Sequence, residues 1–244
     1  MNSKRYFPTI ILVKTQLAEN FGAVARSMEN FNFTNLRLVH PKFDLNSEKI
    51  LPLAAGASKV LRNVSIFNSL EEAVSDFNFL IGFTARNRTF NKKFISIDDG
   101  MNQIIEKFSH ENKIAIIFGP ENSGLSNNDL TLIDRLITIK SNPIFSSINL
   151  SHAVILFCYE WSKFISQNES FEIKSQKKIL AKKEDLLNFF HRLELLLSKS
   201  GFIKTKQRKK TITTKLKNIF NRMDLTKNEL DALMGIINSL YKSR

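Results

Sequence analysis

Residues 114–125 form the segment IAIIFGPENSGL, and this segment is the strongest single indication of the fold. Ile114 to Phe118 make a short apolar run typical of a β-strand, and Gly119 follows directly at its carboxyl end. In an open α/β sheet, ligands bind in the crevice at the carboxyl ends of the strands. The sequence therefore predicts a candidate site in the loop from Gly119 to Leu125.

Similar runs occur on both sides of this segment and alternate with amphipathic helical stretches as far as residue 165. Such alternation predicts an α/β domain with a largely parallel sheet, which we assign to residues 1–165. The other predicted strands are Thr9–Val13, Leu36–Val39, Val64–Phe67, Phe79–Gly82 and Leu136–Ile139.

Three further segments are candidate parts of the site. Phe83–Arg88 and Lys140–Leu150 are loops at the ends of predicted strands, and Asn20–Arg26 comes after the first strand. The chain contains neither G-x-G-x-x-G nor G-x-x-x-x-G-K-[ST], so a Rossmann dinucleotide site and a P-loop are not supported. Taken singly, the polar residues have ordinary interpretations. Asn20 and Asn149 suit helix N-caps, Arg26 a solvated helix charge, and Glu121 an exposed loop acid.

Leu150, Val154, Phe157, Trp161 and Phe164 recur at helical spacing, and the helix that they predict is apolar well beyond one stripe. Such a helix needs cover on several sides. Either the core surrounds it or a second subunit does, so a homodimer is a hypothesis.

A second unit follows a polar linker at residues 166–183. The pattern of residues 184–244 predicts three helices, Glu184–Ser200, Ile212–Met223 and Thr226–Tyr241. Gly201 fits the C′ position that closes the first helix, and Thr226 with Glu229 has capping-box spacing.

Charge separates the two units. Residues 1–166 hold 18 basic and 15 acidic side chains, whereas residues 167–244 hold 18 and 8. Between Lys199 and Arg222 there is no acid. This excess predicts a nucleic-acid-binding surface, against the alternative of a solvated charge run. The residues assigned to it are Lys204, Lys206, Arg208, Lys209, Lys210, Lys215 and Lys217.

Several classes of protein are disfavoured. Cys158 is the only cysteine of the 244 residues, so no intrachain disulfide forms, and the histidines show no pairing that suggests a metal site. No apolar run is long enough for a membrane span or a signal peptide. We expect a cytoplasmic protein without a metal.

Three segments together resemble the sequence motifs of the SpoU (TrmH-type) RNA ribose 2′-O-methyltransferases, which belong to the SPOUT class. They are Asn20-x-Gly22-x-x-x-Arg26, then Phe118-Gly119-Pro120-Glu121 with Gly124-Leu125, then Asn142-Pro143 with Ser146-Ser147-Ile148-Asn149-Leu150-Ser151. Over nearly its whole length, the C-terminal unit included, the chain is most similar to the bacterial tRNA (cytidine/uridine-32-2′-O-)-methyltransferases. Phe83 and Thr84 stand where that family often has smaller residues.

The resemblance implies a trefoil-knotted α/β methyltransferase domain, a small helical tRNA-binding domain at residues 184–244, and a homodimer. It implies S-adenosylmethionine as cofactor, tRNA as substrate, and catalytic roles for Arg26, Asn20, Glu121 and Asn149. By the same implication the cofactor would be lined by Phe83, Thr84, Ala85, Gly119, Ile139, Ser146, Ser147 and Ile148. Two alternatives stay open: a ribosomal-RNA methyltransferase of the same class, and a non-enzymatic RNA-binding protein on this scaffold.

Overall fold

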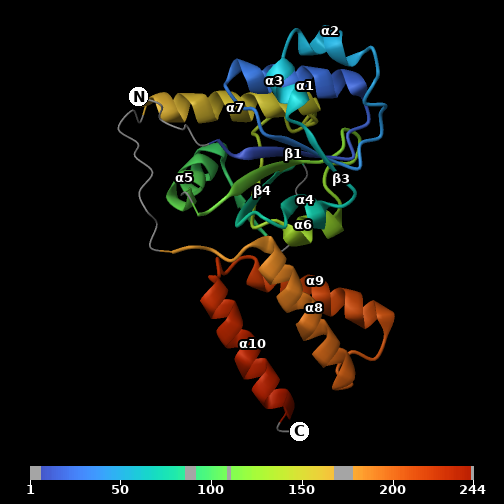
Figure 1. Cartoon of the computed structure of the whole chain (residues 1–244), viewed down its shortest axis with the longest axis vertical. Helices are drawn as coiled ribbons and strands as arrows, with labels where there is room; N and C mark the ends of the chain where they lie inside the picture. Colours follow the sequence, from blue (N-terminus) through green and yellow to red (C-terminus); the bar gives the residue numbers. More distant parts are fainter. Residues whose placement is uncertain (1–6, 86–91, 109–110, 168–177, 243–244) are drawn as a thin grey trace.

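A computed structural model describes residues 7–85, 92–108, 111–167 and 178–242. Its centre is a seven-stranded sheet in which every recorded strand pair is parallel, with the order β3-β2-β1-β6-β4-β7-β5 (Figure 1). The strands are β1 Thr9–Val13, β2 Leu36–Val39, β3 Ser65–Phe67, β4 Phe79–Phe83, β5 Lys93–Ile95, β6 Ile114–Phe118 and β7 Arg135–Ile137.

Successive side chains of the central strands enter opposite layers of the core, as the two-residue period of a strand requires. Ile114, Ile116 and Phe118 of β6 belong to one apolar cluster, whereas Ala115 and Ile117 belong to the other. Both faces of the sheet are therefore buried, which explains why these strands are continuous apolar runs in the sequence.

Helices cover the two faces unequally (Figure 1). On one face α1 (Ala18–Asn30) packs against α7 (Leu150–Gln167), with α5 (Ile97–Lys107) beside α7 and the short α2 (Ile50–Ala54) and α3 (Ser58–Arg62) over α1. The short helices α4 (Leu70–Val74) and α6 (Asn127–Leu132) lie on the other face. This thinner layer is the one on which the C-terminal unit sits.

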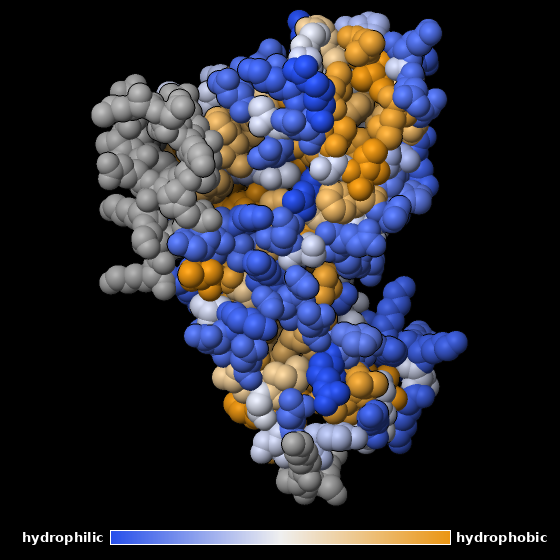
Figure 2. All heavy atoms as spheres, in the orientation of Figure 1, coloured by the Kyte–Doolittle hydropathy of each residue, from blue (hydrophilic) through white to orange (hydrophobic). Residues whose placement is uncertain are grey.

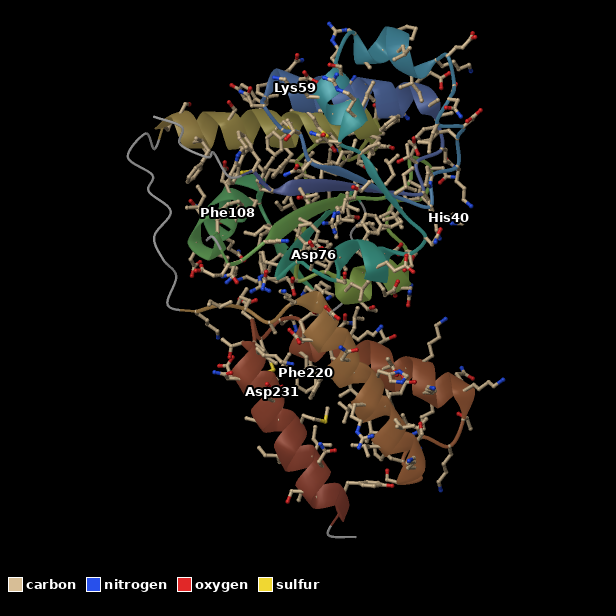
Figure 3. The ribbon with its side chains drawn as sticks, viewed as in Figure 1. His40, Lys59, Asp76, Phe108, Phe220 and Asp231 are labelled. Atoms are coloured by element: carbon tan, nitrogen blue, oxygen red, sulfur yellow. The ribbon has the colours of Figure 1, made fainter. Side chains whose placement is uncertain are left out.

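The C-terminal unit consists of α8 (Lys183–Lys199), α9 (Lys206–Phe220) and α10 (Lys227–Lys242). Its own apolar cluster includes Leu186, Phe189, Phe190 and Leu230, with Phe220 packed against them (Figure 3). The unit thus has a small core separate from the two layers of the sheet.

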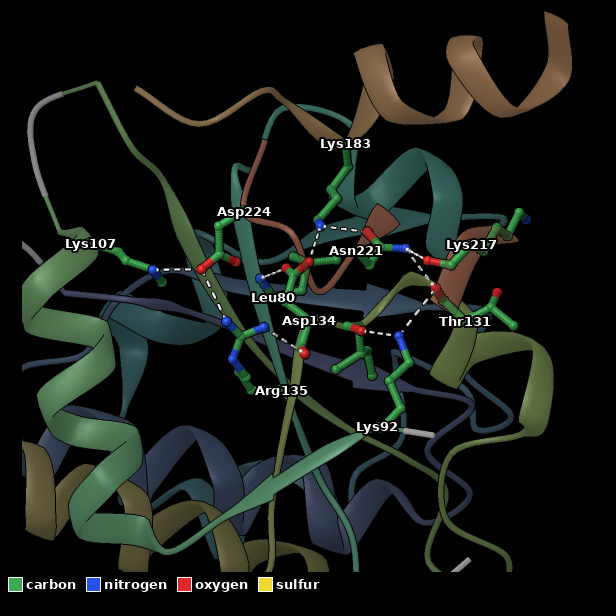
Figure 4. Close-up of polar contacts among 11 residues, drawn as sticks. Leu80, Lys92, Lys107, Thr131, Asp134, Arg135, Lys183, Lys217, Asn221 and Asp224 are labelled. Atoms are coloured by element: carbon green, nitrogen blue, oxygen red, sulfur yellow. Dashed lines mark hydrogen bonds and ion pairs between the residues drawn. The ribbon is translucent and has the colours of Figure 1, made fainter. Parts of the chain in front are cut away.

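A buried polar network joins this unit to the sheet, and we call it the docking network: Lys92, Asp134, Arg135, Lys183, Asn221 and Asp224 (Figure 4). Lys183 donates from Nζ to Asp134 Oδ1 over 2.6 Å and to Asn221 Oδ1 over 3.0 Å. Asp134 also accepts from the backbone N–H of Leu80 at 2.7 Å. The charged partners are between 2% and 8% exposed, apart from the partly exposed Asp224, so the network is closed to solvent except at Asp224.

The predicted α/β architecture and helical C-terminal unit are confirmed, with differences at particular elements. Strand β5 was not predicted, because it is a three-residue edge strand in which only Ile95 is buried. Helix α9 begins at Lys206 and not at Ile212, because Thr205 caps it by accepting a hydrogen bond from Arg208 N–H at 3.2 Å. The knot and the domain boundaries stay predictions.

The predicted linker ends in packed structure. Leu180 and Ala181 are buried, and Leu180 forms an isolated antiparallel bridge with Thr226. Gly201 has the expected positive φ of 76° after α8, and Thr226 with Glu229 forms the reciprocal hydrogen bonds of a capping box.

Candidate active site

The carboxyl ends of β6, β4 and β7 surround a cavity of about 200 Å³. The three strands are neighbours in the sheet, so the loops that follow them meet at one edge. Every residue assigned to the cofactor by resemblance lines this cavity: Phe83, Thr84, Ala85, Gly119, Ile139, Ser146, Ser147 and Ile148. The end of the predicted loop Phe83–Arg88 lies outside the described residues.

Seven further residues that the sequence did not single out for the cofactor also line the cavity: Phe118, Pro120, Glu121, Asn122, Gly124, Leu150 and Ala153. Five of them, all except Asn122 and Ala153, belong to the motifs quoted above, so proximity in the sequence would have found them. Ala153 lies one turn into α7, where only the packing of that helix places it.

The loop after β6 requires glycine for a steric reason. A Cβ on Gly119 would lie 2.2 Å from the backbone nitrogen of Leu125 and 2.4 Å from the carbonyl carbon of Gly124. Gly124 has φ of +65° and donates its N–H to Pro120 O at 2.8 Å, which closes the turn. The loop therefore folds back on itself beside the cavity, and its shape depends on both glycines.

Aromatic rings form one wall of the cavity. Phe83 and Phe118 stack with ring centroids 4.7 Å apart, and Phe157 of α7 meets Phe83 edge-on at 5.8 Å. Phe83 is only 6% exposed, so its ring belongs to the core as much as to the cavity. The wall is therefore rigid and apolar, which suits a flat or aliphatic part of a ligand.

Beside the cavity, three of the four predicted catalytic residues form the amide–carboxylate cluster, defined as Asn20, Glu121 and Asn149. Asn20 donates from Nδ2 to Glu121 Oε1 at 2.9 Å and accepts at Oδ1 from Asn149 Nδ2 at 3.1 Å. The loops after β1, β6 and β7 are thus tied together by side chains more than 100 residues apart in the sequence.

Glu121 also holds the start of α1. Its carboxylate accepts from the backbone N–H of Gln16 at 3.0 Å and from that of Leu17 at 3.5 Å, while the N-cap residue Leu17 offers no side-chain cap. A carboxylate at a helix N-terminus satisfies orphan amides and is favoured by the helix dipole. Glu121 is therefore positioned to orient α1.

Asn149 has two tasks. Its Oδ1 accepts from the backbone N–H of Ser151 at 2.9 Å and from the Ser151 hydroxyl at 2.7 Å, which caps the start of α7, while its amide group donates to Asn20. The ordinary N-cap interpretation is therefore confirmed for this residue, and its catalytic role stays a prediction. Asn20, in contrast, lies within α1 and does not cap it.

Arg26 lies two turns along α1 from Asn20 and is exposed. It does not line the cavity, and within the described parts of the chain neither Glu121 nor Asn149 contacts it. Packing requires glycine at Gly22 of the same motif, because a Cβ there would lie 2.4 Å from the carbonyl oxygen of Ile50 in α2.

The predicted tRNA-binding residues are remote from the cavity lining. Six of the seven are exposed, on the α8–α9 connection and on α9, and Lys217 is half-buried. Lys209 is held by Glu194 over 2.5 Å, so its charge is already partly compensated. The positive charge of this surface is therefore less uniform than the sequence suggests.

Two groups with strongly shifted pKa values lie outside the cavity. Burial lowers the pKa of Lys92 to about 7, against the opposing effect of the Asp134 charge. Burial also raises the pKa of the Asp134 carboxyl. Sequence reasoning missed these residues, although two charges inside the apolar segment Leu130–Ile139 are a signal that could have found Asp134 and Arg135.

Two negative findings concern metals and membranes. Among the described residues, no cluster of three or more His, Cys, Asp or Glu side chains could hold a metal ion. No described helix is long and apolar enough to cross a membrane.

Cys158 is buried in α7, and burial raises the pKa of its thiol, so it is not a candidate nucleophile.

Residues 8–159 match the sequence model of the SpoU rRNA methylase family. The chain belongs to this family. Residues 184–244 match a second model, the C-terminal domain of the tRNA methyltransferase TrmJ. The cavity and the amide–carboxylate cluster both lie within the part of the chain that matches the SpoU family.

Similar proteins align with this chain over nearly its whole length. The chain is 34% identical to a tRNA (cytidine/uridine-2′-O-)-methyltransferase TrmJ of Photorhabdus laumondii, with 96% of each chain covered. It is 32% identical to TrmJ of Escherichia coli K12, over 95% of this chain and 94% of that protein. Among solved structures, TrmJ from Z. mobilis has 34% identity and a TM-score of 0.85, covering 96% of this chain and 99% of the other.

Proposed function

We propose that the protein is an S-adenosylmethionine-dependent tRNA methyltransferase that modifies the ribose 2′-hydroxyl of cytidine or uridine at position 32 of the anticodon loop. The observation that carries the proposal is that the second and third motif segments line one cavity, and that Asn20 of the first segment is hydrogen-bonded to both of them in the amide–carboxylate cluster. The match of residues 184–244 to the TrmJ C-terminal domain favours tRNA over ribosomal RNA.

The cavity suits the proposed cofactor. S-adenosylmethionine, when bound, supplies an activated sulfonium methyl group. Phe83 and Phe118 would support an apolar part of it, and the backbone around Gly119 and the Ser146–Ile148 segment would meet its polar edges. We therefore assign the eight predicted lining residues to cofactor binding.

Methyl transfer requires the protein to align the reacting groups and to stabilise the negative charge that develops on the hydroxyl oxygen. A ribose hydroxyl is a poor nucleophile, so in-line placement and stabilisation of the developing oxyanion carry most of the acceleration. We assign the second task to Arg26, whose guanidinium is exposed and has no partner among the described residues. A guanidinium is a poor proton acceptor, so Arg26 acts as a hydrogen-bond donor and not as a base.

The amide–carboxylate cluster would position these parts. Glu121 fixes the start of α1, the helix that presents Arg26, and Asn149 fixes the start of α7, which lines the cavity. Asn20 joins the two through its amide. The cluster thus sets the orientation of Arg26 relative to the cofactor cavity.

We further propose a homodimer that acts in the cytoplasm. Leu51 and Leu53 on α2 are 68% and 41% exposed, and Tyr159 on α7 is 49% exposed. Figure 2 shows an apolar area on the end of the α/β domain that carries α2. Exposed apolar side chains that gather on one face are typical of a subunit interface.

The test is methyl transfer to unmodified tRNA, followed by nucleoside mass spectrometry and mapping of the modified position. We expect a 2′-O-methylated pyrimidine in the anticodon loop, formed without added metal and unaffected by a chelator that leaves the tRNA folded. Methylation of ribosomal RNA alone would favour the first alternative. Absence of any transfer with intact cofactor binding would favour the non-enzymatic one.

A further inference from the structure

One aromatic ring of the C-terminal unit is left out of its core. Residues 184–244 contain four phenylalanines, of which Phe189, Phe190 and Phe220 pack together with ring centroids 4.9 to 6.0 Å apart. Phe202 is 51% exposed and does not join that apolar cluster. An ordinary core role therefore does not explain it.

The backbone holds Phe202 at a defined place, the connection between α8 and α9 at the end of the unit away from the sheet (Figure 1). Gly201 turns the chain with φ of +76°, and the N–H of Ile203 donates to Leu197 O at 3.3 Å. Thr205 then caps α9. The ring is thus presented on a short, hydrogen-bonded turn.

One cation contacts this ring, and further cations are close to it in the sequence. The guanidinium carbon of Arg208 lies 5.3 Å from the ring centroid, in cation–π contact. Lys204, Lys206 and Lys210 are exposed nearby in the sequence, and there is no acidic residue between Lys199 and Arg222. An open aromatic face with positive charge around it is complementary to an unpaired nucleotide, which offers a base for stacking and a phosphate for the cations.

We propose that Phe202, braced by Arg208, is a stacking platform for an unpaired base of the bound RNA. The proposal rests on the proposed tRNA substrate and adds to it a contact that depends on an unpaired base. Because Phe202 does not line the cavity, the stacked base is distinct from the nucleotide that receives the methyl group.

The test compares Phe202→Leu, which removes the aromatic face, with Phe202→Tyr, which keeps it. Binding to tRNA and to a fully paired RNA duplex of equal length is measured by fluorescence anisotropy at several salt concentrations, after circular dichroism has shown that both variants fold. We expect Phe202→Leu to weaken tRNA binding about 5-fold to 100-fold at every salt concentration, as loss of one base stack does. Duplex binding and the salt slope should not change, because no charge is removed. Phe202→Tyr should bind as the wild type does.

Equal tRNA binding by Phe202→Leu and wild type, with methyl transfer intact, would overturn the stacking platform and leave the proposed function standing. Equal weakening for tRNA and duplex, or equal weakening by Leu and Tyr, would also overturn it. A wild-type protein that binds no RNA would instead contradict the proposed function, and an acidic protein partner would then be the alternative for this surface.

Discussion

Two polar clusters of this molecule differ in burial and in what their surroundings do to them. The docking network is closed to solvent except at Asp224, contains full charges, and holds the groups with strongly shifted pKa values, Lys92 and Asp134. The amide–carboxylate cluster has one charge among two neutral amides and borders a cavity.

A strongly shifted side-chain pKa therefore does not by itself locate an active site. Perturbed pKa values mark functional sites only when the groups also face a space that a ligand can enter. Lys92 donates to the backbone oxygens of Thr131 and Ile133, and Asp134 is saturated by Lys183 and Leu80 N–H. The docking network therefore joins two units of the chain, whereas the amide–carboxylate cluster is the one that borders a cavity.

The largest expected effect comes from breaking the docking network. Asp134→Ala leaves Lys183 buried without its counter-charge, and we expect a loss of about 3 to 5 kcal/mol in the free energy of unfolding, measured with urea. Glu160→Gln, which breaks the exposed pair with Lys163, is the matched control and should cost less than about 1 kcal/mol. Equally small losses in the free energy of unfolding for both variants would mean that the buried network contributes no more to stability than an exposed ion pair.

Arg26→Ala tests the residue that the amide–carboxylate cluster is proposed to position. We expect turnover to fall about 100-fold to 1000-fold, or roughly 3 to 4 kcal/mol of transition-state stabilisation, while cofactor affinity and stability barely change. Arg62→Ala, an exposed arginine on α3 outside the motifs, should leave turnover unchanged. If calorimetry showed an equal loss of cofactor binding, Arg26 would belong to the cavity's structure and not to catalysis.

The lowered pKa of Lys92 gives the docking network a pH dependence of known sign. Between pH 7 and the ordinary lysine pKa of 10.5, the unfolded chain binds a proton that the folded chain has lost, so stability rises with pH over this window. One proton contributes at most about 1.4 kcal/mol per pH unit. Below pH 7 both states carry the proton and the contribution to the slope vanishes.

Comparing wild type with Lys92→Met isolates this term, because Asp134, Lys183, Arg135 and Arg222 around it are the same in both proteins. Urea unfolding at pH 7.5, 8.5 and 9.5 should give the wild type the steeper rise. Parallel curves would show that Lys92 stays protonated in the folded state.

The smallest effect concerns two lysines of α9. Lys210→Gln should reduce the slope of log affinity for tRNA against log salt by roughly 0.7 to 0.9 if this lysine neutralises one phosphate. Lys209→Gln should change it less, because Glu194 already holds Lys209. An identical slope change for the two would mean that Lys209 leaves Glu194 when RNA binds. Deleting the whole unit would be a poorer test, since it also removes Lys183 from Asp134.

Much of the fold could be predicted from local pattern. Three strands begin and end where predicted, Thr9–Val13, Leu36–Val39 and Ile114–Phe118, because buried parallel strands are continuous apolar runs. The edge strand β5 was missed because its residues Lys93–Ile95 lack such a run and gain their conformation from pairing with β7.

The candidate site divides in the same way. The sequence by itself indicated which loops border the cavity, because loops that follow parallel strands must meet at one edge of the sheet. The individual residues came from the resemblance to the SpoU family. Only the tertiary structure decided that Glu121 caps α1 and that Arg26 stands apart from it, since both facts depend on how α1 packs on the loop after β6. The docking network likewise needs Asp134 and Lys183, distant in sequence, to be buried together. A sequence pattern records the period and the charge of the side chains. It does not record which distant groups are buried against each other, because that depends on how the two units pack.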